Sequence, residues 1–285
     1  MKFTTRFAPS PTGPLHLGHA YSALLAHDLA QAAGGSFLLR IEDIDQSRAR
    51  PEWEAQIYQD LDWLGIGWAR PVIRQSDRME SYRAALDDLW ARGLLYACTC
   101  NRRDIAAATS APQEGAAPII GPDGITYPGT CRAAGHPRET GALRLDMAKA
   151  LETLSSTPLT FLENGQGPNG ETGQQTISPD QLITTVSDVV LARRDMGTSY
   201  HLSVVLDDAA QKVTLVPRGA DLFEATQIHV VLQALLGLPK PCYHHHRLIR
   251  DEAGKRLAKR DDARAIALYR ENGATPQEIH DMVGL

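Results

Sequence analysis

The chain is poor in cysteine and has no long hydrophobic run. Four cysteines among 285 residues are too few for a disulfide framework, and reduced thiols that bind a metal ion fit this usage better. No stretch approaches the roughly 18 apolar residues of a membrane span, and residues 1–6 turn polar before a signal-peptide core can form. We therefore expect a cytoplasmic protein with no membrane partner.

An excess of basic residues is also missing. The formal net charge of −5 argues against a general nucleic-acid-binding surface but leaves room for a local site. Lysine and arginine do concentrate in residues 247–270, where a solvated helical face is the simplest interpretation. With 43% hydrophobic residues, the chain can bury a large core, as one domain with an insertion or as two domains.

The beginning of the chain predicts a parallel strand–helix–strand unit. Residues 3–8 read as a short strand, residues 15–33 as a helix and residues 36–41 as a second strand. This order predicts an α/β fold with a parallel sheet. Three carboxylates follow within residues 42–45, at the carboxyl edge where open α/β sheets bind ligands.

Later segments are predicted from their apolar spacing and their turn residues. We expect helices over residues 51–64, 77–92 and 226–236, strands over residues 186–191 and 202–206, and irregular structure over residues 101–138 and 163–179. Residues 165–170 formally match a dinucleotide-binding fingerprint. We reject the match because Pro168 interrupts it and no helix-forming sequence follows.

Residues 6–19 form a turn rich in Pro and Gly that carries two histidines. His16 and His19 are spaced to share one face of a helix starting near residue 14 or 15, whose positive N-terminal end would face an anion. Gly18 permits close approach of the backbone to a ligand. Two surface histidines would be the simpler interpretation of either residue alone, but the whole string favours a nucleotide-phosphate site.

A second cationic group, Arg256-Leu257-Ala258-Lys259-Arg260, lies late in the chain. An ammonium in such a loop can meet triphosphate charge in the transition state, where binding energy accelerates a reaction. Any basic loop has this composition, so the group becomes informative only together with residues 6–19.

Together these motifs resemble the class I aminoacyl-tRNA synthetases. The chain carries Pro-x-Pro-x-Gly-x-x-His-x-Gly-His near its start, Arg-Ile-Glu-Asp-Ile-Asp at residues 40–45 and a Lys-Met-Ser-Lys-Ser-like loop at residues 256–260. Residues 6–10 and 40–43 resemble the glutamyl branch of the class. The resemblance spans nearly the whole chain. It implies a Rossmann-like parallel sheet with a zinc-bearing insertion and a short helical C-terminal segment.

The resemblance also implies a role for each matching residue. His16, His19 and Lys259 would act on the ATP phosphates, with Mg²⁺ accompanying ATP as substrate. The glutamate site would comprise Arg6, Phe7, Ala8, Pro9, Ser10, Glu42, Tyr200 and Arg218, and the ATP site His16, Gly18, His19, Arg256, Leu257, Ala258, Lys259 and Arg260. The arginines suit the two carboxylates of glutamate, and a carboxylate at residue 42 suits its ammonium group. Alone, Arg218 would read as a surface arginine after a strand.

Three cysteines suggest a metal site. Cys98 and Cys100 form a Cys-x-Cys pair and Cys131 follows, a pattern of tetrahedral zinc that lacks one sulfur ligand. Structural zinc would clamp an insertion too irregular to fold by burial alone. The glutamyl-queuosine tRNA(Asp) synthetases hold zinc with a Cys-x-Cys…Tyr-x-x-x-Cys set, which implies Tyr127 as the oxygen ligand. The gap before Tyr127 is long for that family, so His136 is a second candidate, and buried or redox-active thiols are the alternative to any metal.

Other departures from the family pattern concern the late loop and the remaining metal-binding residue types. Ala258 stands where serine is common and Arg256 where lysine is common, which should weaken a phosphate contact without removing the charge of the loop. Cys242 is expected to serve packing. The histidines of residues 244–246 do not suggest a metal site, because consecutive residues of a strand point to opposite faces.

The segments follow from the resemblance. We expect the first half of the catalytic domain over residues 1–95, a zinc-containing, acceptor-type subdomain over residues 96–185, the second half of the catalytic domain over residues 186–262, and a short helical segment over residues 263–285. Only 26 residues follow Lys259, enough for about two short helices, one after Thr275, and not for an anticodon-reading domain.

The expected enzyme is therefore a truncated paralogue that activates L-glutamate with ATP in the absence of tRNA. It would then transfer glutamate to the queuosine base of tRNA(Asp), with no obligate protein partner and with no clear general base for the transfer step. Two alternatives remain open from the sequence. One is the catalytic body of a glutamyl-tRNA synthetase that needs a separate anticodon module, and the other is a non-catalytic tRNA- or nucleotide-binding paralogue.

Overall fold

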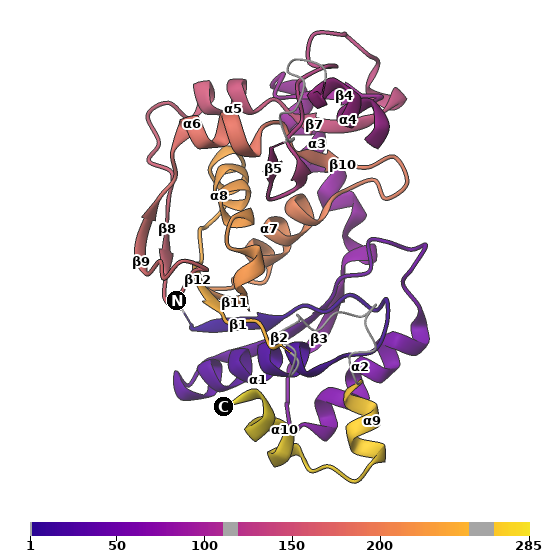
Figure 1. Cartoon of the computed structure of the whole chain (residues 1–285), viewed down its shortest axis with the longest axis vertical. Coiled ribbons are helices and arrows are strands. Elements are labelled where there is room, and N and C mark those ends of the chain that lie inside the picture. The colour runs from indigo at the N-terminus through magenta and orange to yellow at the C-terminus, as the bar shows by residue number, and fades with distance from the viewer. Residues whose placement is uncertain (1, 111–118, 251–264) are drawn as a thin grey trace.

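The computed structural model describes residues 2–110, 119–250 and 265–285 (Figure 1). Its first half contains a parallel sheet in the order β1 (Thr4–Phe7), β2 (Ser36–Ile41), β3 (Ala69–Arg74), connected by helices α1 (Leu17–Ala32) and α2 (Pro51–Trp63). The α/β fold and the strand–helix–strand unit expected from the sequence are confirmed. Helix α1 ends before Gly34, whose φ of +58° favours glycine.

A second sheet continues the first. Its order is β11 (Leu215–Gly219), β12 (Cys242–His246), β8 (Thr160–Glu163), β9 (Gly173–Thr176), and only the β8–β9 pair is antiparallel. The backbone N–H of Thr214 donates to the carbonyl of Thr4, so β11 lies beside β1. The buried helices α7 (Tyr200–Ala210) and α8 (Ala225–Leu235) adjoin this part of the fold (Figure 1).

A separate antiparallel sheet contains β10 (Val190–Ala192), β7 (Ala142–Leu145) and β4 (Leu95–Cys98), in that order. Around it lie helices α3 (Met79–Ala91), α4 (Arg102–Ser110), α5 (Met147–Thr153) and α6 (Pro179–Gln181) and the hairpin of β5 (Ile120–Gly121) and β6 (Gly124–Ile125). In Figure 1 this part lies at the opposite end of the molecule from α1 and α2.

Three expectations about secondary structure need correction. Residues 202–206 belong to helix α7 and not to a strand, because Ser199 caps a helix there by accepting a hydrogen bond from the N–H of Leu202. A short buried apolar run does not distinguish the two structures. The strand expected over residues 186–191 is shorter and lies later in the chain: β10 covers Val190–Ala192, and Val186 ends the π-helical turn Leu182–Val186. Residues 101–138 contain α4 and the β5–β6 hairpin, so they are less irregular than predicted.

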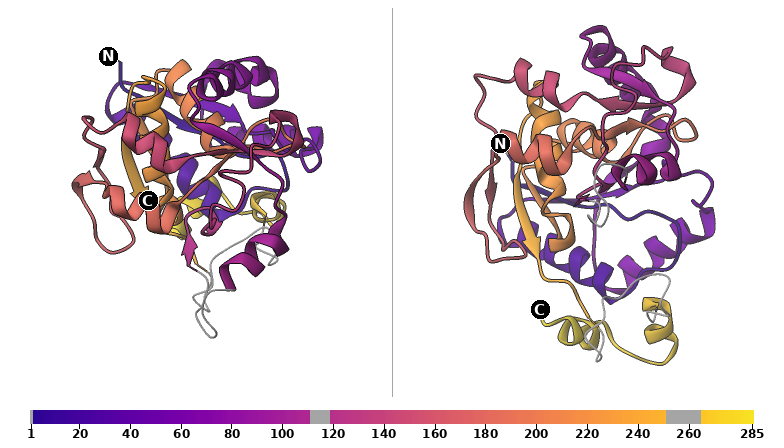
Figure 2. Two further views of the ribbon diagram at one scale, coloured as in Figure 1. Left: turned by 90° about the horizontal axis from the view of Figure 1, so that it is seen from above. Right: turned by 45° about the horizontal axis from the view of Figure 1, so that its top comes forward.

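The C-terminal residues form the two short helices expected, α9 (Ile266–Glu271) and α10 (Pro276–Val283). Thr275 and Glu278 cap α10 reciprocally, and Ile279 and Val283 are buried in the apolar cluster that contains α1. Figure 2 shows this segment, in yellow, beside the indigo beginning of the chain, where α10 contacts α1. Among the helices in the described part of the chain, none combines the length and apolarity that crossing a membrane requires.

Candidate functional site

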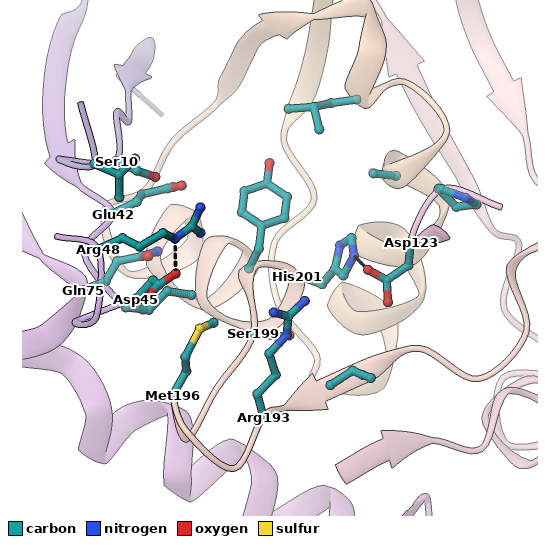
Figure 3. A pocket seen from close by; sticks show the side chains of 17 residues that line it. Ser10, Glu42, Asp45, Arg48, Gln75, Asp123, Arg193, Met196, Ser199 and His201 are labelled. Atoms are coloured by element: carbon teal, nitrogen blue, oxygen red, sulfur yellow. Dashed lines mark hydrogen bonds and ion pairs between the residues drawn. The ribbon is translucent and has the colours of Figure 1, made fainter. Parts of the chain in front are cut away.

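Three adjoining cavities lie at the carboxyl ends of β1, β2 and β11. The innermost has a volume of about 170 Å³ and is lined by Arg6, Glu42, Tyr200 and Arg218 among others. It shares Ser22 and Leu222 with a cavity of about 200 Å³ that His16 and His19 line. It shares Glu42, Tyr200 and Leu222 with a third cavity of about 340 Å³ (Figure 3).

Arg218, at the end of β11, is held in the innermost cavity by three hydrogen bonds. Its Nε donates to His245 Nε2 at 3.1 Å, its Nη2 to Thr226 Oγ1 at 2.6 Å, and its Nη1 lies 3.0 Å from His229 Nδ1. These bonds use three of the five N–H donors of a guanidinium group. The side chain is 5% exposed, so its remaining donors suit a buried anion such as a carboxylate.

The two histidines that contact Arg218 each have a further buried partner. His245 Nδ1 lies 2.5 Å from Glu163 Oε2, and His229 Nε2 lies 3.2 Å from His201 Nδ1. Burial and the neighbouring charge of Arg218 lower the pKa of His229 well below its usual range, so this ring is neutral. A neutral imidazole fixes the direction of the guanidinium without adding a competing positive charge.

Glu42 follows β2 and is positioned by Arg40, which the sequence analysis did not select. Arg40 Nη2 donates to Glu42 Oε1 at 3.1 Å, and the Arg40 side chain has no exposed surface. Burial raises the pKa of Glu42, against the opposing charges of Arg40 and Arg6. A carboxylate in this position can receive an ammonium group, which would replace the lost solvation.

Asp207 and Asp208, at the end of α7, complete the site and were also missed. Asp208 Oδ1 lies 3.2 Å from Arg6 Nε and 2.7 Å from Arg40 Nη1, while Asp207 accepts hydrogen bonds from Gln75 and Tyr82 and pairs with Arg78. A signal was present, because two adjacent acids end a strongly apolar run. Buried carboxylates require partners, and the sequence alone did not say which arginines supply them.

The remaining residues of the expected glutamate site do not all reach the same cavity. Phe7, Ala8 and Tyr200 line the innermost cavity, and burial raises the pKa of the Tyr200 hydroxyl. Ser10 lines the 340 Å³ cavity instead, opposite His201 in Figure 3. Pro9 acts through its backbone, whose carbonyl accepts a hydrogen bond from the N–H of Glu42 at 3.0 Å.

His16 and His19 are in contact, although not as two residues of one helix. His16 is the N-cap of α1, with its Nδ1 accepting from the N–H of Gly18, while His19 Nδ1 accepts from the N–H of His16. The ring centroids lie 3.8 Å apart. A phosphate contact by either ring would therefore use Nε2. A Cβ at Gly18 would come within 3.0 Å of the His16 ring, so glycine keeps this cap compact.

His246 lines the same 200 Å³ cavity as His16 and His19. From the sequence, residues 244–246 were considered only as a metal site, and that interpretation was rejected. His246 Nε2 lies 2.8 Å from Ser22 Oγ, and its Nδ1 lies 2.9 Å from the carbonyl of Arg247. Burial lowers the pKa of His246 to about 4. Within the described residues, the group of possible metal ligands is that of Cys98, Cys100 and Cys131, and the histidines of β12 do not belong to it.

The late basic loop, with Arg256, Leu257, Ala258, Lys259 and Arg260, lies outside the described residues. Described residues close to each end of residues 251–264 lie near His16. Ile249 lines the His16 cavity, and Ala265 forms a β-bridge with His16, next to a hydrogen bond from the N–H of Ile266 to the carbonyl of Leu15.

The cysteines predicted to bind a metal converge. The Sγ atoms of Cys98, Cys100 and Cys131 all lie within 4.8 Å of one another, and Cys100 Sγ is 3.4 Å from Cys131 Sγ. Tyr127 Oη lies 3.3 Å from Cys98 Sγ and 3.7 Å from Cys100 Sγ, and it accepts the N–H of Cys131 at 2.8 Å. His136 is not part of this group. Three sulfurs and one oxygen fit a four-coordinate zinc ion.

Comparison with known proteins gives consistent results. The catalytic domain of the class I tRNA synthetases for E and Q matches residues 2–118 and 172–285. The Glutamyl-Q tRNA(Asp) synthetase of Rhodobacter capsulatus is 64% identical over 281 residues, with 99% of each chain covered. The enzyme of the same name from Geobacter sulfurreducens is 38% identical over 268 residues, with 93% of this chain and 78% of that protein covered.

Solved structures agree on the fold. A glutamate tRNA ligase from Elizabethkingia meningosepticum, in complex with its amino acid, superposes with a TM-score of 0.73 at 26% identity. The alignment covers 100% of this chain but 61% of that one, so the chain spans about three fifths of the solved ligase. A methionyl-tRNA synthetase from Mycobacterium tuberculosis, at 12% identity and a TM-score of 0.62, shares the fold alone.

Proposed function

Because the chain belongs to the class I tRNA synthetases for glutamate and glutamine, and among them to the glutamyl-Q tRNA(Asp) synthetases, we propose that it activates L-glutamate with ATP and transfers the glutamyl group to queuosine in tRNA(Asp). The observation that carries this proposal is the innermost cavity. Two arginines and one carboxylate lie around a space of about 170 Å³, next to the cavity lined by His16 and His19.

In the first step, Arg6 and Arg218 bind the carboxylates of glutamate and Glu42 binds its ammonium group. One carboxylate oxygen attacks the α-phosphorus of ATP, the bond to the β-phosphate oxygen breaks, and pyrophosphate leaves. His16, His19 and Lys259 stabilise the phosphate charge together with the Mg²⁺ that accompanies ATP. Positioning and charge stabilisation suffice for such an in-line transfer, so no covalent enzyme intermediate is needed.

In the second step, a hydroxyl group on the cyclopentene ring of queuosine attacks the glutamyl carbonyl carbon. The new ester bond forms, the bond from that carbon to the phosphate oxygen breaks, and AMP leaves while the hydroxyl proton is released. The 340 Å³ cavity supports this arrangement, because it shares Glu42 and Tyr200 with the 170 Å³ cavity of the glutamate site. An acceptor in this cavity would meet the activated carboxyl group.

We also propose that Cys98, Cys100, Cys131 and Tyr127 hold one structural zinc ion. The convergence of their donor atoms supports this assignment. Zinc would join the end of β4 to the segment that follows β6. That segment has few buried apolar residues of its own. Its contribution would be to stability, because the metal-binding energy of such a site adds to the folding energy.

Exchange of labelled pyrophosphate into ATP tests the activation step. The protein should catalyse exchange with glutamate in the absence of tRNA, and no exchange would refute the proposal. Exchange that strictly requires tRNA(Glu) would assign the chain to conventional glutamyl-tRNA synthetases instead. Labelled glutamate should then be incorporated into tRNA(Asp) that contains queuosine and not into the same tRNA without it. Incorporation independent of queuosine would refute the proposed acceptor.

A further inference from the structure

One large cavity is not used by the steps above. It has a volume of about 610 Å³ and lies between the cysteine group, the β5–β6 hairpin and strands β7 and β10. It shares Asp123, Val190 and Arg193 with the 340 Å³ cavity, which in turn shares Glu42 and Tyr200 with the glutamate cavity. The three cavities therefore adjoin one another in a row, with Asp123 at the boundary between the 610 Å³ and 340 Å³ cavities.

Asp123 occupies the turn of the β5–β6 hairpin, in the long segment between Cys100 and Tyr127. The hairpin is held against the π-helical turn Leu182–Val186. Thr126 Oγ1 donates to the carbonyl of Thr185 at 2.7 Å, and the backbone of Gly121 is so close to that carbonyl that a Cβ there would lie 2.3 Å from it. The segment between Cys100 and Tyr127 is long for the family. Its hairpin, held by these contacts, fixes the position of the Asp123 carboxylate.

The side chain of Asp123 points towards His201, with 3.5 Å between Oδ1 and Nε2 (Figure 3). Arg218 donates to Nδ1 of His229, so the neutral His229 ring carries its proton on Nε2 and donates to His201 Nδ1. His201 accepts at Nδ1, so its Nε2, which faces Asp123, donates and the Asp123 carboxylate accepts.

Asp123 is ionised and partly open to the cavities. Burial would raise its pKa, but the hydrogen bond from His201 and the charges of Arg144 and Arg193 outweigh burial and lower the pKa. The side chain is 36% exposed. Arg144 is engaged with the carbonyl of Asp188 and the ring of Tyr127, whereas Arg193 is exposed beside the junction. Of these groups, Asp123 is the one suited to a cationic ligand.

We propose that Asp123 binds the secondary ammonium group that joins the deazaguanine base of queuosine to its cyclopentenediol ring, an inference that rests on the proposed function. The 610 Å³ cavity then receives the base, Asp123 pairs with the ammonium at the junction, and the diol enters the 340 Å³ cavity beside Tyr200 and the glutamyl group.

The test compares Asp123→Asn with wild type and with Asp180→Asn, which makes the same change at an exposed site on α6 outside all of these cavities. The kcat/KM of transfer to queuosine-containing tRNA(Asp) is divided by the exchange rate of the same preparation. Asp123→Asn should lower this ratio about tenfold through KM, as expected for one partly exposed ion pair, and Asp123→Glu should restore part of it. An unchanged ratio overturns the proposal, because Asp123 would then act only through His201, His229 and Arg218 on the glutamate site.

A charge-specific probe separates this proposal from the proposed function. The probes are 7-aminomethyl-7-deazaguanine, which carries an ammonium group, and 7-cyano-7-deazaguanine, which is neutral. Wild-type protein should bind the cation about tenfold more tightly in a direct binding measurement, and Asp123→Asn should lose that preference. A wild-type protein without the preference overturns the inference. If the preference is present but tRNA(Asp) is not glutamylated, the proposed function fails and the cation site stands.

Discussion

Replacing Asp208 by asparagine tests whether the buried ion pairs of Asp208 stabilise the fold and orient the arginine of the proposed amino-acid site. Asp208 lies 3.2 Å from Arg6 Nε and 2.7 Å from Arg40 Nη1, and the side chains of these arginines are 6% and 0% exposed. Arg6 lines the 170 Å³ cavity proposed to bind glutamate, while Arg40 holds Glu42 by a hydrogen bond. The substitution keeps the size of the side chain and removes one negative charge from between two buried positive ones.

The expected magnitude follows from the charges of the whole cluster. Three guanidinium groups face three carboxylates, those of Arg6, Arg40, Arg78, Asp207, Asp208 and Glu42. The variant leaves one uncompensated positive charge where water cannot solvate it. Breaking a buried ion pair by removing one partner costs about 3–5 kcal/mol, and we expect the free energy of unfolding to fall by that amount. The KM for glutamate should rise because Arg6 loses the carboxylate that orients it.

Urea unfolding measures the first effect, and pyrophosphate exchange at varied glutamate concentration measures the second. Asp62→Asn, on the exposed face of α2, is the matched control and should change neither quantity. If Asp208→Asn shifts the free energy of unfolding by less than about 1 kcal/mol, the pairing contributes no more than a surface ion pair. That result, with an unchanged KM, would refute the argument.

Three further predictions concern pH, metal and the late loop. Stability should decline as pH falls from about 6.5 to 4, because burial lowers the folded-state pKa of His246 to about 4 and the unfolded chain binds a proton that the folded chain excludes. The free energy of unfolding should change by about 1.4 kcal/mol per pH unit in that window because of His246. His246→Asn should remove this pH dependence, which urea unfolding at several pH values measures. Cys98→Ser should reduce bound zinc and the melting temperature, and metal analysis that finds full zinc occupancy would contradict the assignment. Lys259→Ala should lower the exchange rate far more than glutamate affinity, and an unchanged rate would exclude this lysine from the reaction.

Several features could be predicted because they depend on residues close together in the chain. Pro and Gly restrict the backbone in residues 6–19, and Thr275 with Glu278 caps a helix through contacts three residues apart. The parallel strand–helix–strand unit follows from the alternation of its apolar segments. The convergence of Cys98, Cys100 and Cys131 could also be predicted, because cysteines in this spacing are typical of a metal site in a reduced protein.

The local arguments failed where two structures satisfy the same pattern. Residues 202–206 form a helix because Ser199 caps it and both faces are buried, while a short apolar run is also typical of a strand. His16 and His19 were expected within one helix, and their Nδ1 atoms instead cap its first turn. In both cases the hydrogen-bond partners of the backbone decide the outcome, and composition does not specify them.

The sequence by itself determined the fold class, the family motifs and the chemistry available at the site. It supplied arginines that suit carboxylates, a glutamate that suits an ammonium group and three cysteines that suit a metal ion. Only the tertiary structure decided how these groups are held. Asp208 pairs with Arg6, which is 202 positions away in the chain, and with Arg40, which is 168 positions away. The contact between Asp123 and His201 also joins distant parts of the chain. Electrostatic partners of buried charges are set by which elements pack together, and that packing depends on the whole chain.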